Sequence, residues 1–237
     1  VCGEVGFGKT EVAIRAAFKA VMDGKQVAML APTTILCQQH LNHFRDRMSD
    51  FPVIIEMMSR FRTSSQQRKI AKATADGSVD ILIGTHRLLS ADVAYKDLGL
   101  LIIDEEQRFG VQHKEAIKKL RASIDVLTLS ATPIPRTLAM SVHGDLDVSV
   151  IDELPPGRKA IKTAYRSESK RLEVIGFLKA EIEKGRQVYV VFPLIEESSK
   201  MDYKNLMEGY EHLQEMFPRP TYEVAIVHGR MKPEEKE

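Results

Sequence analysis

Gly3-Glu4-Val5-Gly6-Phe7-Gly8-Lys9-Thr10 stands at the start of the chain and fits the pattern G-x-x-x-x-G-K-[ST]. In that pattern, the backbone N–H groups of a glycine-rich loop surround the phosphates of a nucleotide. Glycine permits this close approach because it has no Cβ. We therefore predict that all residues of this loop bind nucleotide, that Lys9 reaches the β- and γ-phosphates, and that the Thr10 hydroxyl binds Mg²⁺. The alternative interpretation is a glycine turn before an ordinary helix.

Apolar residues recur at helical spacing over residues 11–22, directly after the loop. The loop is thus expected to end at a helix N-terminus, where anions are favoured. The strand that normally precedes such a loop is expected to be absent, because the chain begins within the motif. Residues 233–237 resemble the first turn of a helix, and no Met opens the chain, so we expect a piece of a longer protein.

The composition is that of a globular protein, with 43% hydrophobic and 28% charged residues. A net charge of +1 gives no general electrostatic preference for nucleic acid, so any DNA contact would need a local groove. Cys2 and Cys37 form no disulfide framework. His40 and His43 have helical spacing but no third ligand, which disfavours zinc. No apolar run approaches the ~18 residues of a membrane span, so no membrane partner is expected.

Short apolar runs alternate with helical patterns along the first part of the chain. This alternation predicts an α/β fold, a parallel sheet with helices on both faces. Polar clusters follow the predicted strands, and ligands of such sheets bind at the carboxyl edge, so these clusters should converge beside the glycine loop. The predicted strands are 26–31, 51–58, 79–84, 98–103 and 125–129, and the predicted helices are 11–22, 35–48, 66–75 and 114–120.

Asp104 and Glu105 directly follow the strand predicted at 98–103. Adjacent acids at a strand end are common surface residues, but their position downstream of a phosphate-binding loop favours a catalytic pair. We predict that Asp104 binds Mg²⁺ opposite Thr10 and that Glu105 orients and deprotonates the attacking water. With Lys9, these carboxylates are the predicted catalytic residues of an ATP hydrolase.

A second α/β unit is predicted after a linker rich in proline and charge. We expect a first domain at 1–151, a linker at 152–159 and part of a second domain at 160–237. The predicted elements of that part are strands 160–165, 187–192 and 222–227, helices 169–184 and 203–217, and a loop at 195–201.

Five motifs of the chain resemble, in order, those of superfamily 2 helicases and translocases, and most closely the group of RecG and the transcription-repair coupling factor (Mfd). These motifs lie at residues 3–10, 31–34, 84–86, 104–107 and 130–132. Residues 132–137 are shared by both members of the group. Segments 60–63 and 104–110 are more similar to the coupling factor, and segments 144–158, 193–198 and 228–231 are more similar to RecG. Glu4 and Ser130 depart from the usual Asp and Thr.

This resemblance implies two RecA-like domains, the second incomplete, that bind ATP and Mg²⁺ between them and move along duplex DNA. It also implies two groups of site residues besides the catalytic ones. For each threonine in these groups, the alternative is an ordinary helix-cap or turn role, and for the histidine it is a structural hydrogen-bonding role. The residues expected on the DNA side are Thr33, Thr34, Thr85, His86 and Arg87, and those expected to couple ATP to DNA are Gln107, Ser130, Thr132 and Arg136.

The expected function is that of an ATP-dependent double-stranded DNA translocase that remodels branched or stalled-fork DNA in the bacterial cytoplasm, at the nucleoid. One alternative is the same motor acting on a stalled RNA polymerase. Another, for this segment alone, is a non-catalytic nucleotide- or DNA-binding module, and we expect poor hydrolysis without the second domain's arginines. A P-loop kinase or GTPase is disfavoured because it gives no role to the motifs at 84–86 and 130–132.

Overall fold

The computed structural model describes residues 1–59, 62–110, 113, 115, 117, 123–131, 147–157, 159, 161–192, 199–228 and 231. The chain divides into two units, Val1–Lys159 and Ala160–Glu237, which are described separately. Within the described residues, no helix has both the length and the apolar character that a bilayer crossing requires.

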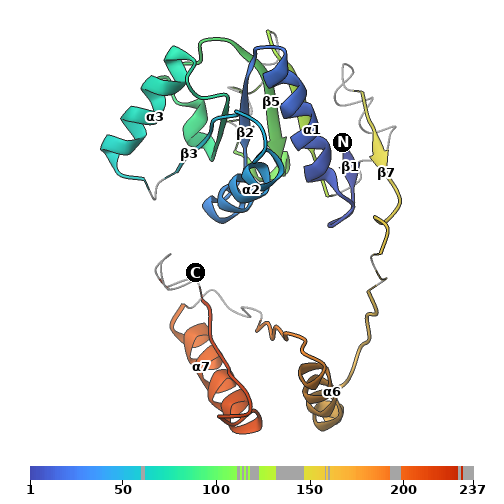
Figure 1. Cartoon of the computed structure of the whole chain (residues 1–237). Helices are drawn as coiled ribbons and strands as arrows, with labels where there is room; N and C mark the ends of the chain where they lie inside the picture. Colours follow the sequence, from blue (N-terminus) through green and yellow to red (C-terminus); the bar gives the residue numbers. More distant parts are fainter. Residues whose placement is uncertain are drawn as a thin grey trace. The chain divides into compact units, whose positions relative to one another are not determined.

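Strands and helices alternate through the first unit, as the sequence pattern predicts (Figure 1). Short 3₁₀ helices, labelled η, follow two of the strands. The elements are β1 (Cys2–Gly3), α1 (Lys9–Met22), β2 (Gln26–Leu30), α2 (Thr34–Arg47), β3 (Ile55–Met58), α3 (Ser64–Asp76), β4 (Ile81–Gly84), η1 (His86–Leu89), β5 (Leu98–Asp104), η2 (Glu106–Arg108), β6 (Asp125–Leu129) and β7 (Val150–Ile151). The helix predicted at 114–120 falls mostly outside the described residues.

The main sheet has the strand order β3-β4-β2-β5-β6, and all its pairs are parallel. In the register, Met29 of β2 lies opposite Ile83 of β4 and Ile102 of β5. Because every strand runs the same way, all carboxyl ends meet at one edge of the sheet. That edge carries the glycine loop and the polar clusters.

Strand β1 corrects one expectation, because a strand does precede the glycine loop. Cys2 and Gly3 pair in parallel with Val150 and Ile151 of β7. On the other side of β1, the Ser130 N–H donates to the Val1 carbonyl at 3.0 Å and the Gly3 N–H donates to the Ser130 carbonyl at 3.2 Å. Two residues carry no recognisable strand pattern, and these distant neighbours supply the pairing.

Side chains alternate between the two faces of the main sheet along each strand, and both faces are buried. Val27 and Met29 pack with α1 and α2 on one face, whereas Ala28 and Leu30 pack with α3 on the other (Figure 1). The predicted arrangement of helices on both faces is therefore confirmed. The cores of both faces consist mainly of aliphatic side chains and methionines.

In the second unit, the two predicted helices are confirmed and the three predicted strands are not. The helices are α6 (Arg171–Glu183), preceded by η3 (Glu168–Lys170), and α7 (Ser199–Met216), which begins within the predicted loop. No described residue of this unit belongs to a strand. An apolar run becomes a strand only when a neighbour takes its backbone hydrogen bonds. Within the run predicted at 187–192, Tyr189 is 86% and Val191 83% exposed.

Gln26 is a buried polar residue that joins three parts of the first unit. Its Nε2 donates to the carbonyls of Thr74 (2.9 Å) and Val79 (2.7 Å), after which β4 begins. Its Oε1 accepts from the N–H groups of Lys96 (2.7 Å) and Asp97 (3.0 Å), which precede β5. One amide thus satisfies four backbone groups that would otherwise need other partners.

Replacement of Gln26 by Leu is predicted to lower the free energy of unfolding by about 3 kcal/mol, because backbone donors and acceptors lose their partners in a buried site. The measurement is denaturant unfolding followed by circular dichroism. Gln39→Leu, at an exposed position of α2, is the matched control and should change stability by less than about 0.5 kcal/mol. Equal stability of the two variants would contradict the role given to Gln26.

Candidate functional site

The glycine loop leads directly into α1 at the carboxyl edge of the sheet. Gly6 and Gly8 have φ angles of 85° and 92°, which L-residues with a side chain rarely adopt. Gly8 is also the N-cap of α1 and provides no side-chain cap. The Glu11 N–H donates to the Gly8 carbonyl at 2.9 Å, whereas the N–H groups of Lys9 and Thr10 have no acceptor among the described residues. These two groups are open to an anion, and the helix dipole favours negative charge at this position.

The Lys9 side chain folds back over the glycine loop. Its Nζ donates to the carbonyl of Gly3 at 2.6 Å and to that of Glu4 at 3.0 Å. These contacts hold an ammonium group at the loop, and no carboxylate of the described residues pairs with it. The arrangement provides a cation beside the uncapped N–H groups, which is the chemistry needed to bind phosphate.

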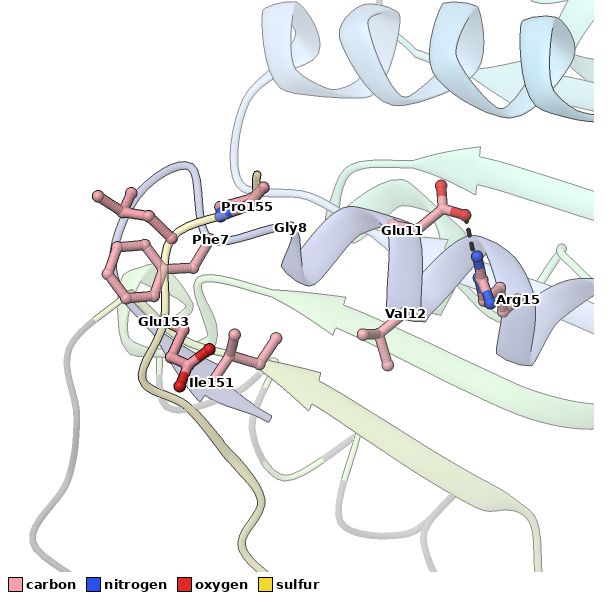
Figure 2. Close-up of a pocket in the computed structure, with 9 residues that line it drawn as sticks. Phe7, Gly8, Glu11, Val12, Arg15, Ile151, Glu153 and Pro155 are labelled. Carbon is pink, nitrogen blue, oxygen red and sulfur yellow. Dashed lines mark hydrogen bonds and ion pairs between the residues drawn. The ribbon is translucent and has the colours of Figure 1, made fainter. Parts of the chain in front are cut away.

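A hollow of about 460 Å³ lies beside the glycine loop (Figure 2). Its lining is largely apolar and comes from the loop, from α1 and from the segment after β7. At its edge, Glu11 accepts from Arg47 of α2 (2.7 Å) and from Arg15 (3.0 Å), and these hydrogen bonds, first that of Arg47, lower the pKa of Glu11. The lining residues are Phe7, Gly8, Glu11, Val12, Arg15, Ile151, Glu153, Leu154 and Pro155.

Asp104 is the last residue of β5, and its side chain lies on the face that α2 covers. This follows from the alternation along β5, because Leu100 and Ile102 pack on that face. Its Oδ2 lies 2.8 Å from Nε2 of His40, a buried residue of α2. The Oδ1 atom makes no hydrogen bond to the described residues, so this oxygen is available to a ligand.

Glu105 is the one non-glycine residue with positive φ (54°) within the described residues. Its backbone N–H donates to the Leu129 carbonyl at 3.1 Å, which fixes the turn between β5 and η2. Its Oε2 accepts from Nε2 of Gln107 at 2.5 Å, and the Arg108 guanidinium lies 3.9 Å away. The structure therefore brings Gln107 beside Glu105.

Thr10 and Asp104 together suit Mg²⁺. The Thr10 hydroxyl and the Asp104 carboxylate supply oxygen ligands, which this ion prefers. Both residues lie at the carboxyl edge, at the start of α1 and at the end of β5. Among the described residues, no group of three or more His, Cys, Asp or Glu side chains is arranged to hold a metal ion.

The predicted DNA-side residues follow β2 and β4 at the same edge. Thr33 caps α2, its Oγ1 accepting from the Leu36 N–H at 3.2 Å, while Thr34 and Thr85 are buried. The exposed His86 ring packs against that of His113, with 4.8 Å between ring centroids. Thr33 is therefore a helix cap in this structure, which is the alternative weighed for it in the sequence analysis.

Arg87 forms a bidentate ion pair with Asp92. Its Nη1 and Nη2 lie 2.6 and 2.5 Å from the two carboxylate oxygens, and its Nε lies 3.3 Å from Oε1 of Gln67. The pair lowers the pKa of the Asp92 carboxyl below its ordinary value. A phosphate that binds Arg87 would have to replace this carboxylate.

Of the predicted coupling residues, Ser130 is buried between β6 and the glycine loop's strand, as its backbone hydrogen bonds to Val1 and Gly3 show. Thr132 and Arg136 lie outside the described residues.

The contact that sequence reasoning missed is that between His40 and Asp104. Its only signal was a histidine on the stripe that Cys37, Leu41 and Phe44 make apolar. Burial raises the pKa of the Cys37 thiol to about 12, so that thiol is not a nucleophile here.

A glycine loop before a helix, with acids at a parallel strand end, is typical of P-loop nucleotide hydrolases. Within that class, the model of the DEAD/DEAH box helicase family matches residues 1–141. The chain belongs to this family.

Curated relatives match over the whole chain. The transcription-repair-coupling factor of Escherichia coli (strain K12) is 52% identical over 237 residues, which are 100% of this chain and 20% of that protein. The one of Bacillus subtilis (strain 168) is 51% identical over 238 residues, 100% of this chain and 19% of that protein. The chain thus spans about a fifth of the length of these relatives.

Among solved structures, RecG bound to a three-way DNA junction matches with a TM-score of 0.71 and 37% identity, over 91% of this chain and 28% of that one. The RecA-like fold and the resemblance to the group of RecG and the coupling factor are thus confirmed. The coupling factors and RecG each match most or all of this chain, including both the part with coupling-factor-like motifs and the part with RecG-like motifs.

Replacing Glu105 by Gly is predicted to raise the free energy of unfolding by about 1 kcal/mol, because it removes a side chain from a left-handed backbone conformation. Chemical denaturation of both proteins measures this difference. Glu106→Gly is the control, since Glu106 lies in η2 without a positive φ, and it should be destabilising. A Glu105→Gly variant that is less stable than the parent protein would show that no strain is relieved there.

Proposed function

We propose that this chain is the ATP-binding part of a double-stranded DNA translocase of DNA repair and recombination, one that remodels branched or stalled-fork DNA. The observation that carries the proposal is the shared carboxyl edge, where the uncapped glycine loop and the Asp104–Glu105 pair both lie in a member of a helicase family. The similarity to a RecG structure that contains a DNA junction supports the choice of branched DNA.

In the proposed mechanism, the loop N–H groups bind the nucleotide phosphates and Lys9 turns from the Gly3 and Glu4 carbonyls toward them. Thr10 and Asp104 would hold Mg²⁺, which when bound would neutralise charge on the phosphates. Glu105 orients the attacking water and takes its proton as the water oxygen bonds to the γ-phosphorus; the bond from that phosphorus to the β–γ bridging oxygen breaks, and ADP and phosphate leave. Gln107 fixes the Glu105 carboxylate through the 2.5 Å hydrogen bond.

The DNA is proposed to lie along the edge that follows β2 and β4. Contacts to backbone phosphates suit a motor that moves without regard to sequence. Arg87 would exchange Asp92 for a phosphate, since both partners offer two oxygens to the guanidinium. Thr33, Thr34, Thr85 and His86 complete this DNA side, and Gln107, Ser130, Thr132 and Arg136 are proposed to couple it to the nucleotide site.

The division into a domain at 1–151, a linker at 152–159 and part of a second domain at 160–237 belongs to the same proposal. In it, ATP binding favours closure of the two domains, and hydrolysis releases them. A motor of this kind acts on the bacterial chromosome, so we place it at the nucleoid.

The second candidate function is action on a stalled RNA polymerase. It is favoured by 52% identity to a transcription-repair-coupling factor over the whole chain. This function would use the same ATP and DNA sites and differ in the partner. Binding of RNA polymerase by the protein that contains this chain would favour it over the remodelling of branched DNA.

Lys9→Ala is predicted to weaken nucleotide binding at least 10-fold, because the loop loses the ammonium group that meets the phosphates. Isothermal titration calorimetry with ATP and Mg²⁺ measures the dissociation constant. Lys19→Ala, which removes an exposed lysine from the last turn of α1, is the control and should bind like the parent chain.

The same titration with a three-way DNA junction, and with a linear duplex of equal length, tests the DNA part of the proposal. The junction is expected to bind more tightly than the linear duplex, with an affinity that falls as salt rises. Equal nucleotide affinities for the Lys9→Ala and Lys19→Ala variants would contradict the proposed nucleotide site. Absence of binding to either DNA at low salt would contradict the DNA side.

A further inference from the structure

His40 is a buried imidazole on the face of α2 that packs against the sheet. It is 5% exposed and shares this face with Cys37, Leu41 and Phe44. A polar ring among apolar side chains costs free energy unless a hydrogen bond compensates for the lost water. The contact that His40 makes is therefore the reason for a histidine at this place.

That contact is the one to Asp104. Nε2 of His40 lies 2.8 Å from Oδ2 of Asp104, and the two side chains are 6% and 15% exposed. Nδ1 of His40 is buried and has no partner among the described residues. The tautomer that fits places the proton on Nε2, which donates to Oδ2, because Nδ1 has no acceptor for a proton of its own.

A carboxylate with one oxygen held in this way has a fixed orientation. Oδ2 is committed to His40, and Oδ1 is the oxygen left to bind a ligand. Replacing a residue that hydrogen-bonds to a metal ligand commonly lowers metal affinity 10- to 100-fold. The bond between His40 and Asp104 has the geometry of such a support.

Helix α2 also links this support to the other end of the site. Thr33 caps the helix N-terminus at the edge that follows β2, and His40 lies about two turns further along the same helix. A rigid helix moves as a unit, so a shift at the capped end would displace the imidazole from Asp104. The helix joins the proposed DNA side to the proposed Mg²⁺ ligand.

We propose that His40 is a positioning residue that holds the Asp104 carboxylate for Mg²⁺ and makes α2 a physical link between DNA and the nucleotide site. This inference rests on the proposed function, because it assigns Asp104 to Mg²⁺ bound with a nucleotide. It does not require His40 to touch the nucleotide or the DNA.

The test measures how strongly Mg²⁺ promotes nucleotide binding, with a fluorescent ATP analogue titrated in Mg²⁺ and in EDTA. His40→Leu removes the donor at similar volume and is expected to raise the half-saturating Mg²⁺ concentration 10- to 100-fold, with unchanged affinity in EDTA. His40→Gln places an amide N–H near the position of Nε2 and should restore most of the effect. His40→Asn, whose amide is too short, should behave like His40→Leu.

The matched control is His43→Leu, the same substitution at an exposed position of the same helix, which should leave the Mg²⁺ dependence unchanged. Asp104→Asn combined with His40→Leu should be no worse than Asp104→Asn alone, since both act through one carboxylate. Thermal unfolding of each variant shows that it is folded.

A His40→Leu variant with the Mg²⁺ dependence of the parent chain would overturn the inference and leave the proposed function intact. An equal loss of affinity in Mg²⁺ and in EDTA, without rescue by His40→Gln, would also overturn it, because the role would then be general packing. Failure of the parent chain to bind nucleotide under any condition would overturn the proposed function and this inference together.

Discussion

The parallel pairing of the strands is the constraint on which the rest of the structure depends. Because β1 through β6 all run in one direction, the residues that follow them reach one edge of the sheet. The N–H groups of the glycine loop and the strand-end carboxylates, about a hundred residues apart in sequence, thereby reach the same edge. Burial of both faces of the sheet fixes the register, since a shift by one residue would turn every apolar side chain to the wrong face.

The same edge is where the structure departs from the most stable local choices. Glu105 has a left-handed backbone, and a histidine replaces an apolar side chain on the buried face of α2. Away from the site, the buried amide of Gln26 uses both its nitrogen and its oxygen in hydrogen bonds to backbone groups. Local exceptions of this kind are expected where side chains must be held for chemistry, because positioning and stability then make different demands.

Sequence reasoning was sufficient where a feature depends on nearby residues. Periodicity located α1 to α3 and the strands of the main sheet, and local sequence placed the glycine loop before a helix and Asp104 and Glu105 at a strand end. Features that depend on distant partners were missed or mistaken. Strand β1 exists through Ser130 and Ile151, and the runs predicted as strands in the second unit have no ladder partners among the described residues. The bond from His40 to Asp104 spans 64 positions, which no local pattern reports.

In the proposed function, one edge of the sheet holds both the phosphates and the metal of a bound nucleotide. A crystal structure of this chain with Mg²⁺ and a non-hydrolysable ATP analogue tests it most directly. We expect the phosphates on the loop N–H groups with Lys9 turned toward them, Mg²⁺ bound by Thr10 and Asp104, and His40 still hydrogen-bonded to Oδ2 of Asp104. Phosphates bound away from the loop, or a metal ion that leaves Asp104 uncoordinated, would contradict it.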